Sequence, residues 1–116
     1  MAWNEIERKR VEKVAREFVE TLRPPAEIRS KLDIGFRLTG QSVEIFEIRP
    51  SWDGVDAGKI EHGVAKATYV AKRDRWRVFW KRADLKWHRY DPAPEVRRLE
   101  DFLALVERDE HACFFG

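Results

Sequence analysis

Cations are concentrated in the middle of this 116-residue sequence. Between Lys66 and Arg89 there are nine lysines and arginines but only two acids, Asp74 and Asp84. The segment after Arg89 has the opposite balance, with three arginines and seven acids. Lysine and arginine are the side chains that bind phosphate oxygens. The central segment is therefore the first candidate for a binding surface.

Five of these cations and one aromatic residue have the spacing of a single sheet face. In a strand, alternate side chains point to the same side. Two strands joined by a turn at Arg73-Asp74 bring the following residues together: Lys66, Lys72, Arg75, Arg77, Phe79 and Lys81. Cations for phosphates beside an exposed ring for base stacking are typical of sheets that hold single-stranded nucleic acid. The pattern predicts such a face, while no RNP-like, KH-like or zinc-knuckle spacing is present to support it.

Two other interpretations of this face stay open. It could be a plain solvated face, since a sheet with one core face must be polar on the other. It could also pack under an acidic C-terminal helix through Glu100, Asp101 and Glu107. The sequence leaves open whether residues 66–81 are exposed or covered.

A histidine and a carboxylate form a second candidate site. Asp84 could orient His88 as a general base, with Arg82, Trp87 and the loop over residues 52–62 completing a pocket. In a strand, however, positions 84 and 88 lie about 13 Å apart at 3.3 Å per residue, so a bend is required. A structural histidine bonded to the backbone is the alternative.

Metal chemistry has little support. His111 and Cys113 are an isolated pair, whereas a zinc site needs about four ligands. Asp84-Leu85-Lys86 matches the carboxylate-x-lysine pattern of metal-dependent nucleases, and Asp33 or Glu44 could supply a further carboxylate. However, about 1.4 such triplets are expected by chance in a chain of this composition. The sequence predicts no metal and no cofactor, and it favours a binding protein over an enzyme.

Length and composition limit the class of protein. A chain of 116 residues suits a single domain over residues 1–116. Lys plus Arg is 23 and Asp plus Glu is 21, so there is no global basic field. A single cysteine excludes an internal disulfide. The charged N-terminal stretch lacks the apolar core of a signal peptide, and no apolar run approaches the length of a membrane span. We expect a cytoplasmic protein with no membrane partner.

The elements that position these residues begin with a helix. Apolar residues over 6–22 recur every three or four positions, Asn4 and Glu7 suit a capping box, and Pro24 ends the helix. A short helical turn is expected over residues 25–31.

The apolar period then changes to two, which indicates strands. Gly40-Gln41 suits a type II′ hairpin that pairs Leu38 with Val43 and Phe36 with Ile45. A polar loop, either functional or mobile, is expected over residues 51–63.

A second hairpin sets small residues against large ones. Its two strands carry the inward-facing residues Ala65, Ala67, Tyr69 and Ala71, and Trp76, Val78 and Trp80. A short strand over 86–90 and a helix over 95–108 follow, with Pro94 at the helix start and the tail packed on the core with Cys113 buried. The fold class is α+β: an N-terminal helix, an antiparallel sheet of about five strands (two hairpins plus a short strand) and a C-terminal helix.

Several strings carry a family resemblance that covers about residues 23–116. They are Arg23-Pro24-Pro25, Gly40-Gln41-Ser42-Val43-Glu44-Ile45, Ala65-Lys66-Ala67-Thr68-Tyr69, Arg82-Ala83-Asp84-Leu85-Lys86-Trp87-His88-Arg89-Tyr90 and Cys113-Phe114-Phe115-Gly116. With these strings the chain resembles a family of small bacterial proteins known as domain of unknown function 3024. The resemblance implies a compact bacterial domain, and it carries over no activity, substrate or catalytic residue.

A protein partner is the third possibility. Trp3 and Trp52 lie at the helix start and in the long loop, and large aromatics anchor protein interfaces. A homodimer through an open sheet edge or the apolar tail would protect unpaired strand groups. The sequence therefore favours binding, of single-stranded nucleic acid or of a protein, with the pocket around Asp84 and His88 as the enzymatic alternative.

Overall fold

Helix α1 spans Glu5–Leu22 and has the predicted capping box. Asn4 Oδ1 accepts the backbone N–H of Glu7 at 2.8 Å, and the Glu7 carboxylate accepts the backbone N–H of Asn4 at 3.3 Å. Arg23 is already extended because Pro24 disfavours a helical residue before it. The computed structural model describes residues 3–51 and 58–115.

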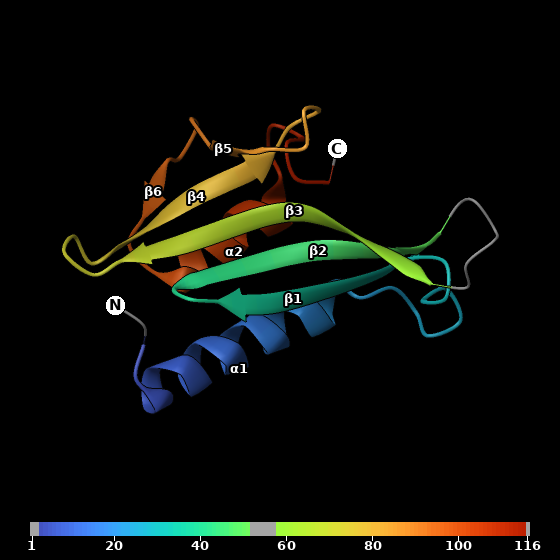
Figure 1. The fold of residues 1–116 in the computed structure, drawn as a ribbon, viewed down its shortest axis with the longest axis horizontal. Coiled ribbons are helices and arrows are strands. Elements are labelled where there is room, and N and C mark those ends of the chain that lie inside the picture. Colours follow the sequence, from blue (N-terminus) through green and yellow to red (C-terminus); the bar gives the residue numbers. More distant parts are fainter. Residues whose placement is uncertain (1–2, 52–57, 116) are drawn as a thin grey trace.

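Six strands form one antiparallel sheet (Figure 1). They are β1 (Asp33–Thr39), β2 (Ser42–Pro50), β3 (Lys59–Val70), β4 (Arg75–Lys81), β5 (Trp87–Arg89) and β6 (Glu95–Val96). The order is β1-β2-β3-β4-β5, and β6 pairs with β4 beside β5. With helix α2 (Leu99–Arg108), this confirms the α+β class. Residues 25–31 form hydrogen-bonded turns rather than a helix.

The first hairpin has the predicted register. Leu38 pairs with Val43 and Phe36 with Ile45. Gly40 has φ +58°, whereas Gln41 is not in the positive-φ region, as a type II′ turn requires. The turn chemistry of two residues thus determines which side chains of β1 and β2 reach the core.

Strand β3 is longer than the sequence indicated. The loop expected over residues 51–63 is shorter, because β3 begins at Lys59 and pairs with the end of β2 as far as Pro50. The register shifts between Ile45 and Phe46, where Val64 is the extra residue of a bulge. Trp52 lies outside the described residues.

The second hairpin keeps the predicted inward-facing residues, but its register differs by two residues from that of a turn at Arg73-Asp74, so only one alanine lies opposite a tryptophan. Ala65 faces Trp80, Ala67 faces Val78 and Tyr69 faces Trp76. The turn takes four residues, 71–74, so that Ala71 and Lys72 lie beyond the strand rather than in it. Asp74 closes the turn with φ +49°, a conformation that Asp adopts more readily than most residues.

Both helices cover the same face of the sheet, here called the inner face. In Figure 1, α2 lies behind β2 and β3, and α1 runs along β1. The buried core joins three groups of residues: Val11, Ala15 and Val19 of α1; Ile34, Val43, Ile45, Ala65, Ala67, Trp76 and Val78 of the sheet; and Leu99, Phe102, Leu103 and Val106 of α2. Neither helix, within the described chain, is long and apolar enough to cross a membrane.

The C-terminal helix starts later than expected. Pro94 does not begin it, because Glu95 and Val96 instead pair with Arg77 and Trp76 at the edge of β4. The tail packs back as predicted, with Phe114 buried against Tyr90 at a ring separation of 4.8 Å. Cys113 is half-buried rather than buried.

Candidate functional site

The predicted basic residues share the face opposite the helices, here called the outer face. Lys66 pairs with Phe79, Thr68 with Arg77 and Val70 with Arg75, and partners in register point to the same side. Lys81 continues the same alternation along β4. Lys72 is the exception, since it lies in the exposed turn at residues 71–74. Five of the six predicted residues therefore form one surface.

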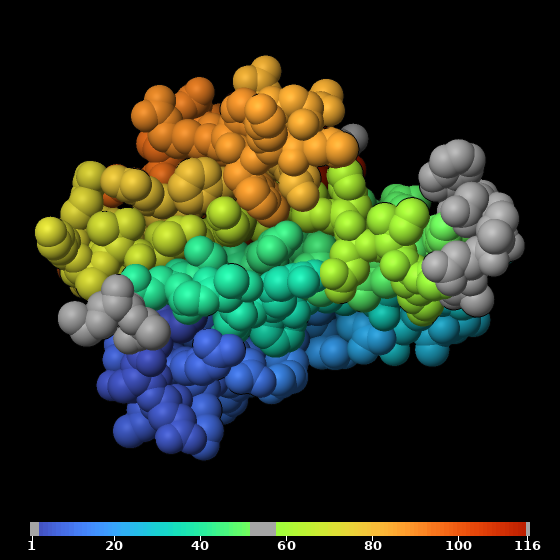
Figure 2. All heavy atoms as spheres, viewed as in Figure 1, coloured from blue at the N-terminus to red at the C-terminus, as the bar shows by residue number. Residues whose placement is uncertain are grey.

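No helix of the described chain lies over this surface. The acidic C-terminal helix, one of the two covers considered from the sequence, packs its apolar side on the inner face instead. Figure 2 shows the outer face, where strand residues from β1 to β4 fill the near side of the molecule. The interpretation that residues 66–81 lie under α2 is wrong.

Cations and aromatic rings alternate on the outer face. Lys66 Nζ lies 5.3 Å from the Phe79 ring centre and 5.2 Å from that of Trp87, and Lys81 Nζ lies 5.1 Å from Trp87. Such contacts are attractive because the ring face carries negative charge. None of these cations forms an ion pair with an acid of the described chain, so each retains charge for a ligand.

Gly63 makes room for the Trp87 ring. A Cβ at position 63 would lie 2.8 Å from Trp87 Cζ2, closer than real Cβ contacts. The absence of a side chain at position 63 therefore leaves the space that the Trp87 ring occupies. The sequence assigned Trp87 to the pocket around Asp84 and His88, whereas its side chain belongs to the outer face.

A groove of about 580 Å³ lies at the β4–β6 end of the outer face. Its lining consists of Arg73, Arg77, Phe79, Arg89, Pro94 and Glu95. Arg73 Nη2 contacts Glu95 Oε1 at 2.9 Å and Arg89 Nε contacts Asp91 Oδ1 at 2.9 Å, while Arg77 is exposed and has no ion pair within the described residues. Three guanidinium groups around one aromatic ring are suited to a phosphate oxygen.

The sequence did not indicate this groove. Arg89 reaches the groove because β5 pairs with β4, and Glu95 because β6 pairs with β4. A strand of two or three residues has no detectable apolar period. The run of cations was the available signal, but it does not show which of them converge.

The opposite end of the outer face has no excess positive charge. Arg37 of β1 contacts both Glu61 and Glu44, and its guanidinium carbon lies 4.5 Å from the Phe46 ring centre. The hydrogen bond to Glu61 is the main cause of a raised pKa of Arg37. The positive charge of the outer face is therefore restricted to β3, β4 and β5.

Asp84 and His88 are brought together. Asp84 Oδ2 lies 2.8 Å from His88 Nε2, so the bend that this pair requires is present. The bend is a tight turn over residues 82–86 in which Leu85 has φ +63°. Asp84 Oδ1 also accepts the Lys86 backbone N–H, and these two bonds, that from Lys86 first, lower the pKa of Asp84.

The other members of that candidate pocket do not converge on the pair. Arg82 stacks on the Trp80 ring at 5.5 Å, and Trp87 lies on the outer face. Both Asp84 and His88 lie at the surface, and neither of them lines the groove beside Phe79. The same described residues contain no group of three or more potential metal ligands.

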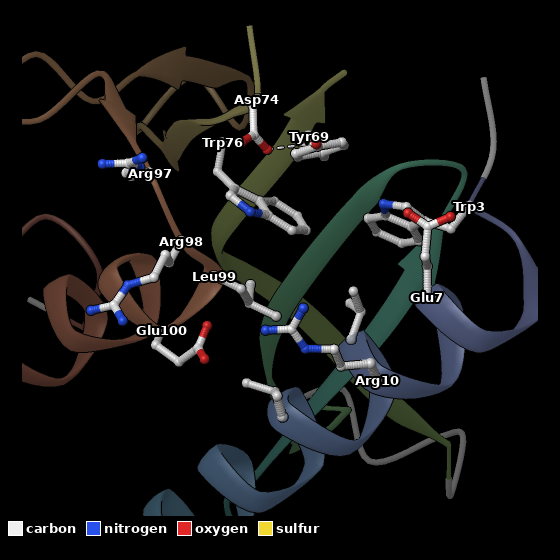
Figure 3. A pocket seen from close by; sticks show the side chains of 12 residues that line it. Trp3, Glu7, Arg10, Tyr69, Asp74, Trp76, Arg97, Arg98, Leu99 and Glu100 are labelled. Carbon is white, nitrogen blue, oxygen red and sulfur yellow. Dashed lines mark hydrogen bonds between the residues drawn. The ribbon is translucent and has the colours of Figure 1, made fainter. Parts of the chain in front are cut away.

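A second hollow, of about 260 Å³, opens near the start of α1 (Figure 3). Three aromatic rings line it, with ring centres 5.7 Å apart for Trp3–Trp76 and 5.2 Å apart for Tyr69–Trp76. Tyr69 Oη donates to Asp74 Oδ1 at 2.7 Å, which, with burial, raises the pKa of Tyr69. The sequence assigned Tyr69 and Trp76 to the core and did not show that a hollow reaches them.

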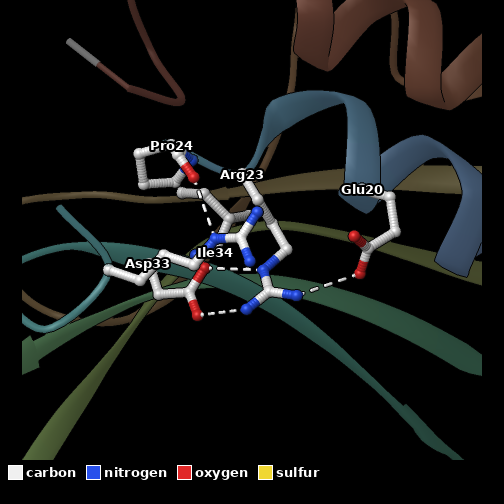
Figure 4. Close-up of polar contacts among 6 residues, drawn as sticks. Glu20, Arg23, Pro24, Asp33 and Ile34 are labelled. Carbon is white, nitrogen blue, oxygen red and sulfur yellow. Dashed lines mark hydrogen bonds and ion pairs between the residues drawn. The ribbon is translucent and has the colours of Figure 1, made fainter. Parts of the chain in front are cut away.

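Asp33 is engaged in structure and is not a free carboxylate. Arg23 Nε and Nη2 donate to its two oxygens at 2.9 Å each, and Arg23 also contacts Glu20 (Figure 4). The Arg23 hydrogen bonds are the main cause of the lowered pKa of Asp33. The Arg23-Pro24-Pro25 string thus ends α1 and fastens it to β1. Asp33 therefore cannot serve as the further nuclease carboxylate.

Comparison with known proteins gives one match. A family model described as domain of unknown function (DUF3024) matches residues 3–116. The match contains every string that carries the resemblance and extends over α1 as well. No curated protein and no solved structure matches the chain.

Proposed function

Since this chain belongs to the DUF3024 family, which carries no assigned activity, we propose its function from the outer face alone: it binds single-stranded nucleic acid without enzymatic activity. The observation that most supports this function is the arginine groove, which is lined by Arg73, Arg77 and Arg89 beside Phe79. This groove lies on a sheet face that no described helix covers. A nucleic-acid ligand also agrees with the cytoplasmic location expected from the sequence.

The arrangement of charge supports a phosphate backbone as the ligand. Lys66, Arg75, Arg77 and Lys81 follow one another over two paired strands, so that phosphates along a chain can each meet a cation. Neighbouring strands are separated by about 4.8 Å. A ligand that crosses β5, β4 and β3 therefore meets cations at successive strands before it reaches Arg37, whose charge is offset by Glu44 and Glu61.

The rings support a single strand rather than a duplex. Phe79 and Trp87 are half-buried on this face, and unpaired bases can stack on such rings, whereas the bases of a duplex are already stacked on one another. Each such stack contributes about 1–3 kcal/mol and tolerates any base. We therefore expect weak sequence preference and little affinity for double-stranded DNA.

A salt-dependent titration tests the proposal. Fluorescein-labelled single-stranded RNA and DNA, titrated with the protein, should show saturable anisotropy with a log–log salt slope of about −2 to −4, as displacement of a few counterions requires. The double variant Arg77→Gln/Lys81→Gln should flatten the slope by about 1.

The matched control removes the same charge elsewhere. Arg8 and Lys13 are exposed residues of α1, away from the outer face, so Arg8→Gln/Lys13→Gln should leave the slope unchanged. Absence of binding even at low salt, or equal effects of the two double variants, would refute the nucleic-acid function. A protein partner at this face would then be the next ligand to test.

A further inference from the structure

The hollow beside α1 is a second candidate binding site. It lies where three segments meet: the first half of α1, the turn end of β3 and β4, and residues 97–100 at the start of α2. Tyr69 and Trp76 have inner-face positions, so this hollow and the arginine groove are on opposite sides of the sheet. What binds in it is independent of the nucleic-acid proposal.

The size of the hollow limits the ligand to a small one. Its volume of about 260 Å³ is below the roughly 300–1,000 Å³ of sites for drug-sized molecules. A cavity of about 150 Å³ can hold a benzene ring. The space therefore suits one six-membered ring with a small substituent, and it is too small for a nucleotide.

The wall of the hollow supplies flat apolar surface and one free donor. Trp76 is only 6% exposed, yet its indole N–H has no acceptor among the described residues. No fully buried side-chain nitrogen or oxygen of the described chain is left without a partner, so this N–H must open onto accessible space. Figure 3 shows its ring between Tyr69 and Leu99, on the side of the hollow that faces Arg10.

The charges of the lining leave a cation available. Glu7 is used in the α1 capping box and Asp74 accepts the Tyr69 hydroxyl. Arg10, in contrast, has no ion pair within the described chain, and in Figure 3 its side chain reaches across the hollow toward Leu99.

The α2 side of the hollow adds to this positive charge. Glu100 is the remaining carboxylate of the lining, and it lies there with two guanidinium groups, those of Arg97 and Arg98. Arg98 Nη2 forms an ion pair with Asp101 Oδ1 at 3.4 Å, whereas Arg97 has no ion pair among the described residues. The unengaged groups of the hollow are therefore mainly donors.

We propose that this hollow binds a small aromatic carboxylate. The ring of the ligand packs against Trp76 and Tyr69, with Trp3 closing the site from the N-terminal side. Its carboxylate accepts hydrogen bonds from the Arg10 guanidinium and the Trp76 indole N–H. Both parts of the ligand are needed, because the hollow offers stacking surface at one side and donors at the other.

Two-dimensional ¹H–¹⁵N NMR of the whole protein tests this assignment, with the indole signals assigned from the single variants Trp3→Phe, Trp76→Phe, Trp80→Phe and Trp87→Phe. The probes are benzoate, which has both parts, benzyl alcohol, which lacks the charge, and acetate, which lacks the ring. Benzoate should shift the Trp76 indole signal saturably and bind about tenfold or more tightly than either other probe. The signals of Trp80 and Trp87 should not move.

The variant pair Arg10→Gln and Arg8→Gln separates a specific contact from net charge. Both residues are exposed on α1, but only Arg10 lines the hollow. Arg10→Gln should weaken benzoate about tenfold or more and leave benzyl alcohol unchanged, whereas Arg8→Gln should leave both unchanged. Equal binding of benzoate and benzyl alcohol, equal effects of the two variants, or shifts at Trp87 instead of Trp76 would overturn the proposal.

Discussion

Gly63 is the residue on which the geometry of the outer face depends. It is buried in β3, and its missing side chain is replaced by the Trp87 ring, with Glu44 Oε1 also 3.1 Å from the position of a Cβ. Lys66 and Lys81 then lie over the same ring. The absence of one methyl group thus leaves room for a ring that lies near two cations.

Gly63→Ala is expected to displace Trp87 and to destabilise the fold by about 1–3 kcal/mol, the usual cost of overpacking. The same variant should lose several-fold in affinity for single-stranded RNA, since one stacking ring is misplaced. Urea unfolding and anisotropy measure the two effects.

The Trp87→Ala background is the control for this prediction. There the methyl group has room, so adding Gly63→Ala should cost much less stability than it does in the natural sequence. A cost that is equal in both backgrounds would show that the ring is not what Gly63 accommodates.

The sequence predicted which candidate residues share a face, but not how they converge. Lys66 and Arg77 follow a period of two, and this period survives in the fold. Lys72 does not belong to the outer face, because the four-residue turn begins at Ala71. The length of that turn depends on how the two strands pair, which the apolar period does not indicate. Asp84 and His88 meet because of Leu85, whose positive φ no apolar pattern indicates.

At the scale of elements, the Arg23–Asp33 ion pair joins the end of α1 to the start of β1. Both side chains are more than half-buried, and Asp33 Oδ1 accepts the Ile34 backbone N–H as well. The folded-state pKa of Asp33 is therefore below its ordinary value of 3.8. The pair stabilises the fold above that pH, and the contribution is lost as the pH falls through the lowered pKa.

Asp33→Asn is expected to destabilise the protein by about 1–3 kcal/mol at neutral pH, because charge-assisted hydrogen bonds to Arg23 are lost. The difference from the natural sequence should shrink as the pH falls below 3.8, since protonation removes the same charge. Thermal unfolding as a function of pH measures it.

A second aspartate serves as the matched control. Asp91 Oδ1 contacts Arg89 Nε at 2.9 Å, the same distance as in the Arg23–Asp33 pair. Both side chains of this second pair, however, are exposed. Asp91→Asn should change stability by less than about 0.5 kcal/mol at any pH. Parallel pH profiles for Asp33→Asn and the natural sequence would contradict the role given to this ion pair.

Helices and strands with an apolar period could be predicted from the sequence, whereas strands that form only by pairing with a neighbouring strand could not. Helix α1 and the two hairpins have apolar periods and turn residues that identify them. The first residues of β3 and both residues of β6 became strand only because β2 and β4 offered unpaired backbone groups. Their own side chains carry no such signal, and Pro94 pointed to a helix start instead.

At the scale of the whole molecule, the sheet separates the buried core from the face proposed to bind nucleic acid. The core lies between the inner face and the two helices, and the charged residues of β3 and β4 lie on the other side. Phe102 of α2 is fully buried, while Arg77 is exposed. The two kinds of substitution should therefore have separable effects.

Phe102→Ala is expected to lower the free energy of unfolding by about 3–5 kcal/mol and, while the protein remains folded, to keep its affinity for single-stranded RNA. Arg77→Gln should do the reverse, with a change in stability within about 0.5 kcal/mol and a clear loss of affinity. Urea titration and anisotropy on both variants check this. A folded Phe102→Ala protein that binds as weakly as Arg77→Gln would contradict the division.

The placement of Trp87 on the outer face and of Trp76 on the inner face gives the molecule a reporter for each side. If 5-fluorotryptophan replaces tryptophan throughout, the two indoles become separate ¹⁹F resonances in a single sample. A ligand of the outer face then moves one resonance and a ligand of the hollow moves the other. Adding the two ligands one after the other would measure directly whether binding on one side of the sheet changes the affinity of the other side.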